Sequence, residues 1–341
     1  MKKNKVILFY SHVKDVALFD DVSFYEQDIR ALREMGFDVV VSNKVKDFFT
    51  VKYDLVYIWW WSRAIIPIIL RPFKRSKVCI AGAFHYSTPL MDGTDYVRRS
   101  WLYKKVVNYC LRNADGNIFV SNYEMKDVVK NLKVNNPHLV HHGIDIKKYH
   151  PEKKCKSDGR KKILTITWLE ENNLKRKCIY QALLAFDDMV KKGFDLEYYL
   201  AGRNGPGAEH LKTFIEKLES SDRIFLLGHI SESEKIKLLQ SVDIFLTPTL
   251  YEGFGVAIAE ALACGTPVIT SDNGAVGEVA GSCALYADPH DPFDISNKIL
   301  NVLENQELSE RLQVESAERI KEKFSYEAHY LALKKAVNNI F

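Results

Sequence analysis

Short apolar runs alternate along the chain with helical patterns, and this alternation restricts the fold more than any other feature. In the first half, a helix predicted at 23–36 ends at a glycine, and strands are predicted at 5–10, 38–42, 54–60, 77–84 and 116–121. Strands that are apolar on both faces are typical of parallel sheets covered by helices on both sides. The first half therefore predicts a doubly wound α/β module.

The same alternation restarts after a charged segment, PEKKCKSDGRKK at 151–162, which lacks apolar periodicity and is interpreted as a linker. A capping box, Ser231-x-x-Glu234, predicts the start of one helix, and strands are predicted at 162–168, 196–202, 223–228, 243–248 and 267–271. We expect an α/β fold with two Rossmann-like doubly wound domains, at 1–152 and 161–324, that face a cleft.

The charge of the chain is divided unevenly between these halves. Residues 1–150 carry 24 Lys and Arg against 15 Asp and Glu, a net charge of +9, whereas residues 151–341 carry 24 against 29, a net charge of −5. A basic half attracts an anionic membrane surface or a phosphorylated substrate. We expect no nucleic-acid partner, because no nucleic-acid-binding motif accompanies the positive charge.

Composition also indicates the cellular compartment. Hydrophobic residues make up 47% and charged residues 27%, as in a globular protein, and the six cysteines form no C-x-x-C pair. Scattered cysteines argue against a disulfide framework and a structural zinc site, and they suit a reducing cytoplasm. The longest apolar run, 55–70, contains Arg63 and Pro67 and falls short of the roughly 20 residues of a membrane span. We expect a cytoplasmic protein, and association with the inner face of the membrane stays open.

The segment TLYEGFGVAIAEALACGTPVI, at 249–269, places two glutamates eight positions apart in an apolar run. Glu252 lies in the loop after a predicted strand, and Glu260 lies in a helix that begins near Gly255. The glycines of this loop let the backbone approach a ligand closely, and the amides at a helix start bind anions. Alanines surround Glu260, where a charge without a partner would be costly. The segment therefore predicts a binding site for a phosphorylated ligand.

Basic residues open the helix predicted at 172–186, namely Lys175, Arg176 and Lys177. Cations in a first turn oppose the helix dipole, so we expect an anion opposite them. A solvated basic turn is the alternative interpretation.

Two features of the first half follow predicted strands. His85, with Tyr86 and Ser87 beside it, comes at the end of the strand 77–84, where parallel sheets carry ligands. The segment IWWWSRAIIPIILRPFKRSK, at 58–77, is aromatic, then apolar, then basic. It has two interpretations that the sequence leaves open: a strand end with a buried helix and a solvated turn, or an acceptor platform or interfacial patch.

Taken together, these motifs resemble the retaining glycosyltransferases of family four, which have the GT-B fold and an E-x7-E motif. Segment 241–281 resembles the family's nucleotide-sugar signature almost continuously. Segment 114–128 resembles the last strand and helix of the first domain, and 139–151 resembles the motif at that domain's end, with His142 in place of an asparagine. Segment 324–337 resembles the closing helix, so the resemblance implies that a C-terminal helix at 325–341 crosses back to the first domain.

The resemblance also implies roles for individual residues. Glu260 would bind the ribose of the donor nucleotide, and Glu252 would bind hydroxyls of the transferred sugar. Catalytic roles are expected for Glu252, His85 and Lys177. Donor binding is expected at Arg176, Gly253, Phe254, Gly255, Val256, Glu260, Gly202, Gly228 and His229, with the backbone amides of 254–256 on the diphosphate. The acceptor side is expected at Trp60, Trp61, Tyr86 and Ser87.

The expected activity is retaining transfer of a sugar from a UDP- or GDP-sugar to a hydroxyl of a glycan or lipid-linked acceptor in polysaccharide or glycoconjugate biosynthesis. We expect no metal and no cofactor, because no D-x-D motif stands where a cation-dependent transferase needs one. Two departures from the family are the loop 11–23, which lacks glycine, and Thr167-Trp168 in place of Gly-Arg. A nucleotide-sugar epimerase and a catalytically silent scaffold that binds a nucleotide sugar are the alternatives.

Overall fold

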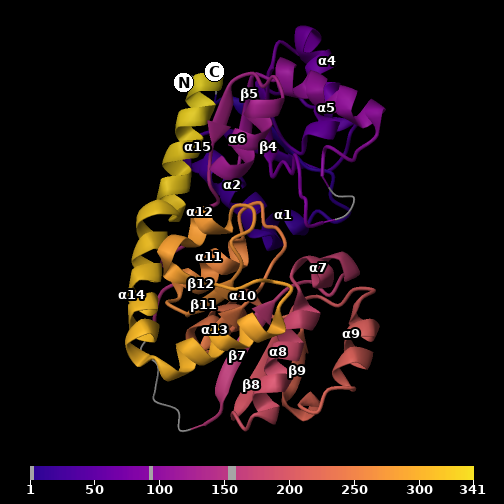
Figure 1. The fold of residues 1–341 in the computed structure, drawn as a ribbon. Coiled ribbons are helices and arrows are strands. Elements are labelled where there is room, and N and C mark those ends of the chain that lie inside the picture. Colours follow the sequence, from indigo (N-terminus) through magenta and orange to yellow (C-terminus); the bar gives the residue numbers. More distant parts are fainter. Residues whose placement is uncertain (1–3, 92–94, 153–158) are drawn as a thin grey trace. The chain divides into compact units, whose positions relative to one another are not determined.

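The computed structural model describes residues 4–91, 95–152 and 159–341, and the chain forms two compact units (Figure 1). Unit 1 comprises Met1–Gly143 and Tyr326–Phe341, and unit 2 comprises Ile144–Ser325. Each unit contains a six-stranded parallel sheet with helices packed around it, which confirms the predicted fold class. Most of the predicted linker, 153–158, lies outside the described residues, and the domain boundaries at 152 and 161 stay a prediction.

Unit 1 has the strand order β2-β1-β3-β4-β5-β6. Its strands are β1 (Val6–Tyr10), β2 (Asp38–Ser42), β3 (Leu55–Trp59), β4 (Lys77–Gly82), β5 (Gly116–Phe119) and β6 (Pro137–Leu139). Its helices are α1 (Leu18–Asp21), α2 (Ser23–Glu34), α3 (Asp47–Thr50), η1 (Trp61–Arg63), α4 (Ile65–Lys74), α5 (Trp101–Asn113), α6 (Asn122–Asn131) and α15 (Tyr326–Ile340).

Unit 2 has the strand order β12-β11-β10-β7-β8-β9. Its strands are β7 (Lys161–Ile166), β8 (Leu196–Ala201), β9 (Ile224–Gly228), β10 (Ile244–Leu246), β11 (Val268–Thr270) and β12 (Ala284–Tyr286). Its helices are α7 (Glu171–Arg176), α8 (Ile179–Lys191), α9 (Ala208–Ile215), η2 (Ser221–Arg223), α10 (Glu232–Ser241), α11 (Val256–Ala263), α12 (Val276–Ala280), η3 (Gly281–Cys283), α13 (Pro292–Glu304) and α14 (Gln306–Lys323).

The central strands explain the continuous apolar runs of the sequence. All five residues of β3 are buried, as are four of the five in β1, because helices cover both faces of the sheet. Two short strands were not predicted: β6 and β12 have three residues each, too few for a periodic signal. The predicted capping box is confirmed, since Ser231 and Glu234 each bond the other's backbone at the start of α10.

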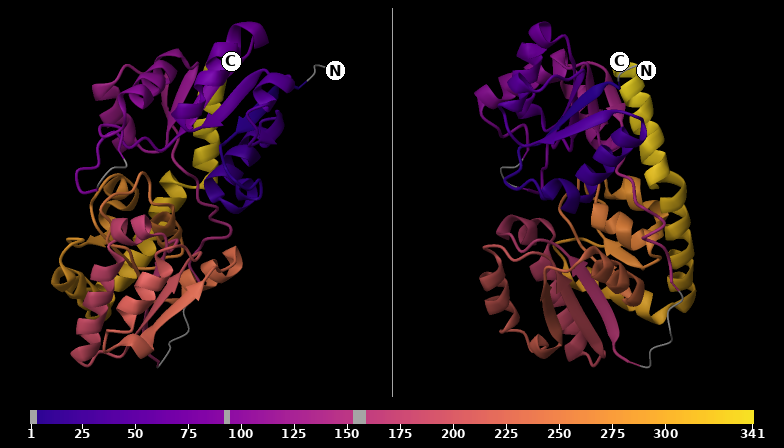
Figure 2. Two further views of the ribbon diagram at one scale, coloured as in Figure 1. Left: turned by 90° about the vertical axis from the view of Figure 1, so that its right-hand side faces the viewer. Right: turned by 180° about the vertical axis from the view of Figure 1, so that it is seen from behind.

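The C-terminal helix α15 belongs to unit 1, where it packs on α2 (Figures 1 and 2). Its His329 is buried, with Nε2 3.2 Å from Oδ1 of Asp28 on α2. The other oxygen of Asp28 accepts hydrogen bonds from the Tyr57 hydroxyl at 2.9 Å and the Trp59 indole at 3.0 Å, both on β3. A buried carboxylate is stable only with such partners, so this cluster fastens α15 to the sheet.

His142, the residue that replaces the family's asparagine, lies beside this cluster. Its Nδ1 is 3.0 Å from the Gln27 amide nitrogen, and its ring stacks on Trp59 with an interplanar angle of 7°. Burial, together with the nearby His329 and His141, lowers the pKa of His142 to about 3. The folded protein therefore keeps this imidazole neutral.

We expect His142 to make unit 1 sensitive to acid. Between pH 6.5 and 3 the unfolded chain binds a proton at this residue and the folded chain does not, so stability falls as the pH falls. From pH 7.5 to pH 5, the natural protein should lose about 2 kcal/mol more unfolding free energy than a His142→Asn variant. Urea unfolding followed by tryptophan fluorescence measures this, since four of the five tryptophans lie in unit 1. Equal losses in the two proteins would contradict it.

Candidate functional site

The candidate site of unit 2 lies at the point where the order of its strands reverses. β7 and β10 are neighbours, but the chain continues from β7 to β8 on one side and from β10 to β11 on the other. The two connections diverge there, and open α/β sheets bind ligands at such reversals, beyond the carboxyl ends of the strands. The connection after β7 carries Arg176 and Lys177, and the connection after β10 carries Glu252.

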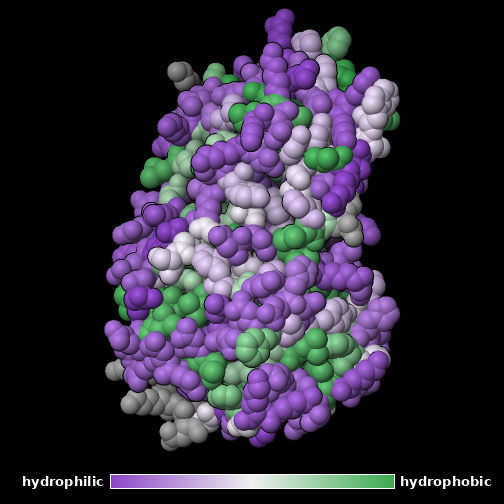
Figure 3. All heavy atoms as spheres, viewed as in Figure 1, coloured by the Kyte–Doolittle hydropathy of each residue, from purple (hydrophilic) through white to green (hydrophobic). Residues whose placement is uncertain are grey.

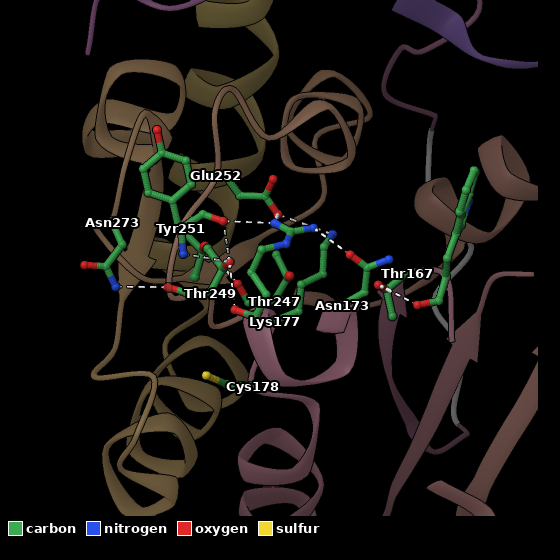
Figure 4. A network of polar contacts seen from close by, with 12 residues as sticks. Thr167, Asn173, Lys177, Cys178, Thr247, Thr249, Tyr251, Glu252 and Asn273 are labelled. Atoms are coloured by element: carbon green, nitrogen blue, oxygen red, sulfur yellow. Dashed lines mark hydrogen bonds and ion pairs between the residues drawn. The ribbon is translucent and has the colours of Figure 1, made fainter. Parts of the chain in front are cut away.

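These three side chains form a partly buried ionic cluster, of which Figure 4 labels Glu252 and Lys177. Oε1 of Glu252 is 2.6 Å from the Arg176 guanidinium and 3.5 Å from the Lys177 ammonium. Burial alone would raise the pKa of Glu252, but the two cations hold it below its ordinary value. Burial also lowers the pKa of Lys177, although Glu252 opposes this shift. The cluster thus keeps Glu252 ionised and carries one more positive charge than negative.

The predicted helix start at Lys175–Lys177 is wrong. The segment forms two helices, α7 and α8, and Cys178 between them has a left-handed backbone with φ of +45°. Lys175 and Arg176 therefore lie in the last turn of α7, where the helix dipole favours cations. The break at Cys178 brings Arg176 to the loop after β10. The Arg176 carbonyl accepts a hydrogen bond from the Leu250 amide at 2.7 Å, and the Arg176 guanidinium donates to the Tyr251 carbonyl at 2.9 Å.

The turn after β11 holds the Glu252 loop in place. The Ala275 amide donates to the Glu252 carbonyl at 2.8 Å, and the Asn273 side chain donates to the Thr249 carbonyl at 2.9 Å. A Cβ on Gly274, which has φ of +69°, would stand 2.4 Å from the Glu252 carbonyl oxygen. This turn lies within the segment 241–281 that resembles the family's nucleotide-sugar signature, but the sequence analysis did not name its residues as part of the site.

The predicted diphosphate-binding amides lie at the start of α11. Gly255 precedes this helix with φ of +89°, a conformation that favours glycine. Phe254 is buried and packs edge-on against Phe324, and Gly253 is buried as well. The loop 253–255 is therefore fixed by its own core contact, and Val256 begins the helix.

Glu260, the second glutamate of the pair, is buried on α11 and has partners that the sequence did not reveal. Its Oε1 is 2.7 Å from the Lys235 ammonium of α10. Burial raises the pKa of Tyr149, and so do the charges of the nearby Glu260 and Glu232; the Tyr149 hydroxyl donates to Glu232 at 3.5 Å. Tyr149 could have been found from its place in the family-like segment 139–151, whereas nothing in the sequence distinguishes Lys235 from the other lysine of α10.

The glycines expected to shape the nucleotide pocket lie at the ends of β8 and β9. A Cβ on Gly202 would fall 1.6 Å from the Thr167 carbonyl oxygen, so the position requires glycine. The Gly202 amide donates to the Gly228 carbonyl at 2.8 Å, and His229 next to it is exposed. Trp168, which stands at the family's arginine position, is also exposed, with the Arg203 guanidinium 5.8 Å from its ring centre.

In unit 1, His85 follows β4 and pairs with a buried carboxylate. Its Nδ1 is 2.9 Å from Oε1 of Glu124, and Oε2 of Glu124 accepts the Phe84 amide at 2.9 Å. Sequence reasoning missed Glu124, because its spacing from Ser121 is also that of a capping box. Ser121 does accept the Glu124 amide, but the Glu124 side chain turns to the His85 loop. Tyr86 stacks on Tyr96, and Ser87 is partly exposed.

The strand order of unit 1 also reverses, between β1 and β3. Trp60, just after β3, has a φ of +80°, a strained backbone conformation that bulky residues rarely adopt. Its indole nitrogen donates to the Tyr25 hydroxyl at 3.3 Å, and that hydroxyl is 2.9 Å from the Ser11 hydroxyl at the end of β1. Trp60 remains 37% exposed. The strained tryptophan thus bridges the two strand ends and leaves part of its surface to solvent.

The prediction that Trp61 faces the acceptor is wrong. Trp61 is buried in the core of unit 1, where it stacks on Phe119 and its indole nitrogen donates to the Asn117 side chain at 2.9 Å. Of the two interpretations of 58–77, the one with a buried helix holds only in part, since Ile69 and Phe73 of α4 are exposed. Trp61 therefore supports the neighbouring loops from within the core.

Known proteins share this fold and parts of the sequence. The alpha-monoglucosyldiacylglycerol synthase of Streptococcus pneumoniae is 27% identical over 280 residues, which are 75% of this chain and 61% of the synthase. The MMP alpha-(1->4)-mannosyltransferase of Mycolicibacterium hassiacum is 26% identical over 306 residues, which are 88% of this chain and 70% of that protein. The structure of sucrose-phosphate synthase from Thermosynechococcus elongatus superposes with a TM-score of 0.83 at 19% identity, with 98% of each chain covered.

The family model described as "Glycosyl transferases group 1" matches residues 147–319. The match spans the whole of the site in unit 2, from Tyr149 to the turn after β11, and it agrees with the resemblance inferred from the motifs. The chain belongs to the group 1 glycosyl transferases.

Proposed function

We propose that the protein is a retaining glycosyltransferase that moves a sugar from a UDP- or GDP-sugar to a hydroxyl of a glycan or lipid-linked acceptor. The observation that carries the proposal is the Arg176–Glu252–Lys177 cluster at the strand reversal of unit 2. It combines cations suited to a diphosphate with an ionised carboxylate suited to sugar hydroxyls. The family match and the names of the two relatives, a glucolipid synthase and a mannosyltransferase, support the transferase class.

In the proposed reaction, the bond between the anomeric carbon and the diphosphate oxygen breaks while the acceptor oxygen attacks from the same face. The proton of the acceptor hydroxyl passes to the departing phosphate. Arg176, Lys177 and the amides of 254–256 stabilise the negative charge that develops on the diphosphate. Glu252, held as an anion between two cations, accepts hydrogen bonds from the transferred sugar and positions its anomeric carbon.

Glu260 supplies the contact to the nucleotide in this proposal. Its carboxylate, oriented by Lys235, accepts hydrogen bonds from the two ribose hydroxyls. In this proposal, Gly202, whose backbone conformation excludes a side chain, forms the wall of the nucleotide site with Gly228 and His229. We propose that the reaction uses neither a metal nor a cofactor, since the two cations supply the charge that a metal would otherwise supply.

The proposal assigns the acceptor to unit 1. His85, oriented by Glu124, contacts the reacting hydroxyls, and the exposed part of Trp60 stacks against an acceptor sugar, with Tyr86 and Ser87 nearby. We propose a cytoplasmic protein with peripheral contact to an anionic membrane. Among the residues that the structure describes, no helix is both long and apolar enough to span a bilayer.

Two alternatives of the sequence analysis are weighed against this proposal. The epimerase receives no support from the family match or the relatives. A catalytically silent scaffold would bind a nucleotide sugar but would not transfer the sugar. Measuring donor binding and sugar transfer on the same variants therefore separates it from the transferase.

The first prediction concerns the ionic cluster. A panel of UDP- and GDP-sugars should contain at least one donor that raises the thermal unfolding midpoint, and Arg176→Met should weaken that protection because a phosphate partner is lost. Glu252→Gln should keep the protection by the free nucleotide diphosphate but reduce kcat about 100-fold. Lys175→Met is the matched control, since its ammonium pairs with Glu171 and lies outside the cluster.

These measurements separate the hypotheses. If no nucleotide sugar protects the protein, with or without acceptors, the proposed function is wrong. Protection without transfer, unchanged by Glu252→Gln, favours the scaffold.

The second prediction concerns Glu124. Glu124→Gln should lower kcat about tenfold and leave the donor KM unchanged, because it removes the charge that orients His85 while keeping the bond to the Phe84 amide. In a His85→Ala background the same change should have no further effect on kcat, which a double-mutant cycle measures. Additive losses, or a large drop in the unfolding midpoint, would mean that Glu124 serves only the fold.

The third prediction concerns Trp60. Trp60→Ala should raise the acceptor KM about fivefold to tenfold, the size of a lost stacking contact, and leave donor protection unchanged. Trp60→Phe retains an aromatic face and should recover most of the loss. An unchanged acceptor KM in Trp60→Ala would remove this residue from the acceptor side.

A further inference from the structure

We propose that the outer face of α4 and α5, in unit 1, docks on an anionic lipid membrane. This inference deepens the proposed function by naming the surface through which a lipid-linked acceptor is reached. Its own evidence lies in the charge and exposure of unit 1 and does not depend on the donor site.

Charge is the first observation. Residues 55–91 contain no Asp or Glu, and their basic residues are Arg63, Arg71, Lys74, Arg75 and Lys77. Residues 96–114 also contain no Asp or Glu, and theirs are Arg98, Arg99, Lys104, Lys105 and Arg112. The two segments contain α4 and α5, which pack against each other. Arg71 of α4 donates to the Asn113 carbonyl at the end of α5 at 2.9 Å. The two basic segments are thus adjacent; of their cations, Arg71 and Lys77 pair with Asp115, and Arg98 pairs with Asp95.

Exposed apolar residues on α4 are the second observation. Ile68 faces the core, whereas Ile69 is 56% exposed and Phe73, one turn later, is 84% exposed. Phe49 of the neighbouring α3 is also exposed, and its carbonyl accepts a hydrogen bond from Lys74 at 2.6 Å. Large side chains exposed this strongly beside basic ones are costly in water and favourable at a lipid interface.

The face of α5 interleaves aromatic and basic residues. Val107, Cys110 and Leu111 pack in the core, and the opposite side carries a stripe at helical spacing: Trp101, Lys105, Tyr109 and Arg112, all exposed. The Lys105 ammonium lies 4.2 Å from the centre of the Trp101 ring. Aromatic rings at the headgroup level with lysine and arginine beside them are the pattern of interfacial helices. In Figure 3, green hydrophobic residues stand among purple ones where Figure 1 labels α4 and α5.

The same observations decide between possible occupants. A second copy of the chain would bring an identical basic face against this one, and like charges oppose such pairing. Nucleic acid would match the charge but would leave Ile69 and Phe73 without an apolar partner. An anionic membrane satisfies both features, because phosphate headgroups match the cations and the acyl boundary accepts the apolar side chains.

The test is flotation of the full chain with vesicles of equal parts phosphatidylcholine and phosphatidylglycerol. We expect binding that falls about tenfold from low salt to roughly 0.5 M NaCl and is weak with pure phosphatidylcholine. The pair Ile69→Ser and Phe73→Ser, and the pair Lys105→Glu and Arg112→Glu, should each lower the bound fraction about tenfold.

Matched controls lie on α15, which packs on α2 in the same unit. Leu331→Ser changes a residue that is 59% exposed, and the pair Lys334→Glu and Lys335→Glu reverses two exposed lysines. Both should leave the bound fraction unchanged.

Three results would overturn the proposal. The first is that the protein binds neutral and anionic vesicles equally, and the second is that the α15 controls lose as much vesicle binding as the α4–α5 variants. The third is that the α4–α5 variants abolish self-association or RNA binding while their vesicle binding persists. Nucleotide-sugar protection is measured on every variant. Its retention when vesicle binding is lost leaves the proposed function intact, and its absence in the natural protein contradicts the function without bearing on docking.

Discussion

The ion pair between Arg176 and Glu252 is the contact on which the architecture of the candidate site depends. It joins the connections that leave the two central strands of unit 2 in opposite directions, and a set of backbone bonds between the same loops reinforces it. Because the pair is largely shielded from water, its members cannot be separated without leaving a poorly solvated charge. The break between α7 and α8 at Cys178, the turn at Gly274 and the start of α11 at Gly255 are all arranged around this contact.

Unit 1 follows the same principle with different chemistry. Its strand reversal is bridged by hydrogen-bonding aromatic residues, from Trp60 through Tyr25 to Ser11, and no ion pair takes part in that bridge. Beside it, the buried Asp28 joins β3 and α15: Tyr57 and Trp59 donate hydrogen bonds to it, and Nε2 of His329 lies 3.2 Å from its other oxygen. Each unit thus has a polar group buried at the place where segments distant in sequence meet, and the requirement for partners determines which segments those are.

The sequence predicts most of the strands and helices because the apolar runs of the strands and the apolar spacing of the helices are both strong signals. Apolar runs located every central strand, and the spacing of Glu252 and Glu260 pointed to the candidate site. What it misses depends on contacts between distant residues: Glu124 looks like a cap, Lys235 looks like an ordinary surface lysine of α10, and Trp61 cannot be told from Trp60 without the backbone turn between them. The helix predicted from 172 fails because a left-handed residue that is not glycine leaves no mark in the sequence.

The internal carboxylate of the ionic cluster has a consequence for selectivity in a cell rich in small anions. Under the proposed function, inorganic phosphate and free nucleotides must compete with Glu252 for the guanidinium of Arg176, and they bring no sugar hydroxyls to the carboxylate that is released. A nucleotide sugar, under the proposed function, brings both the anion and the hydroxyls that the released carboxylate needs. Glu252 therefore lowers the affinity of Arg176 for ligands that lack the sugar, and a complete nucleotide sugar is favoured over them.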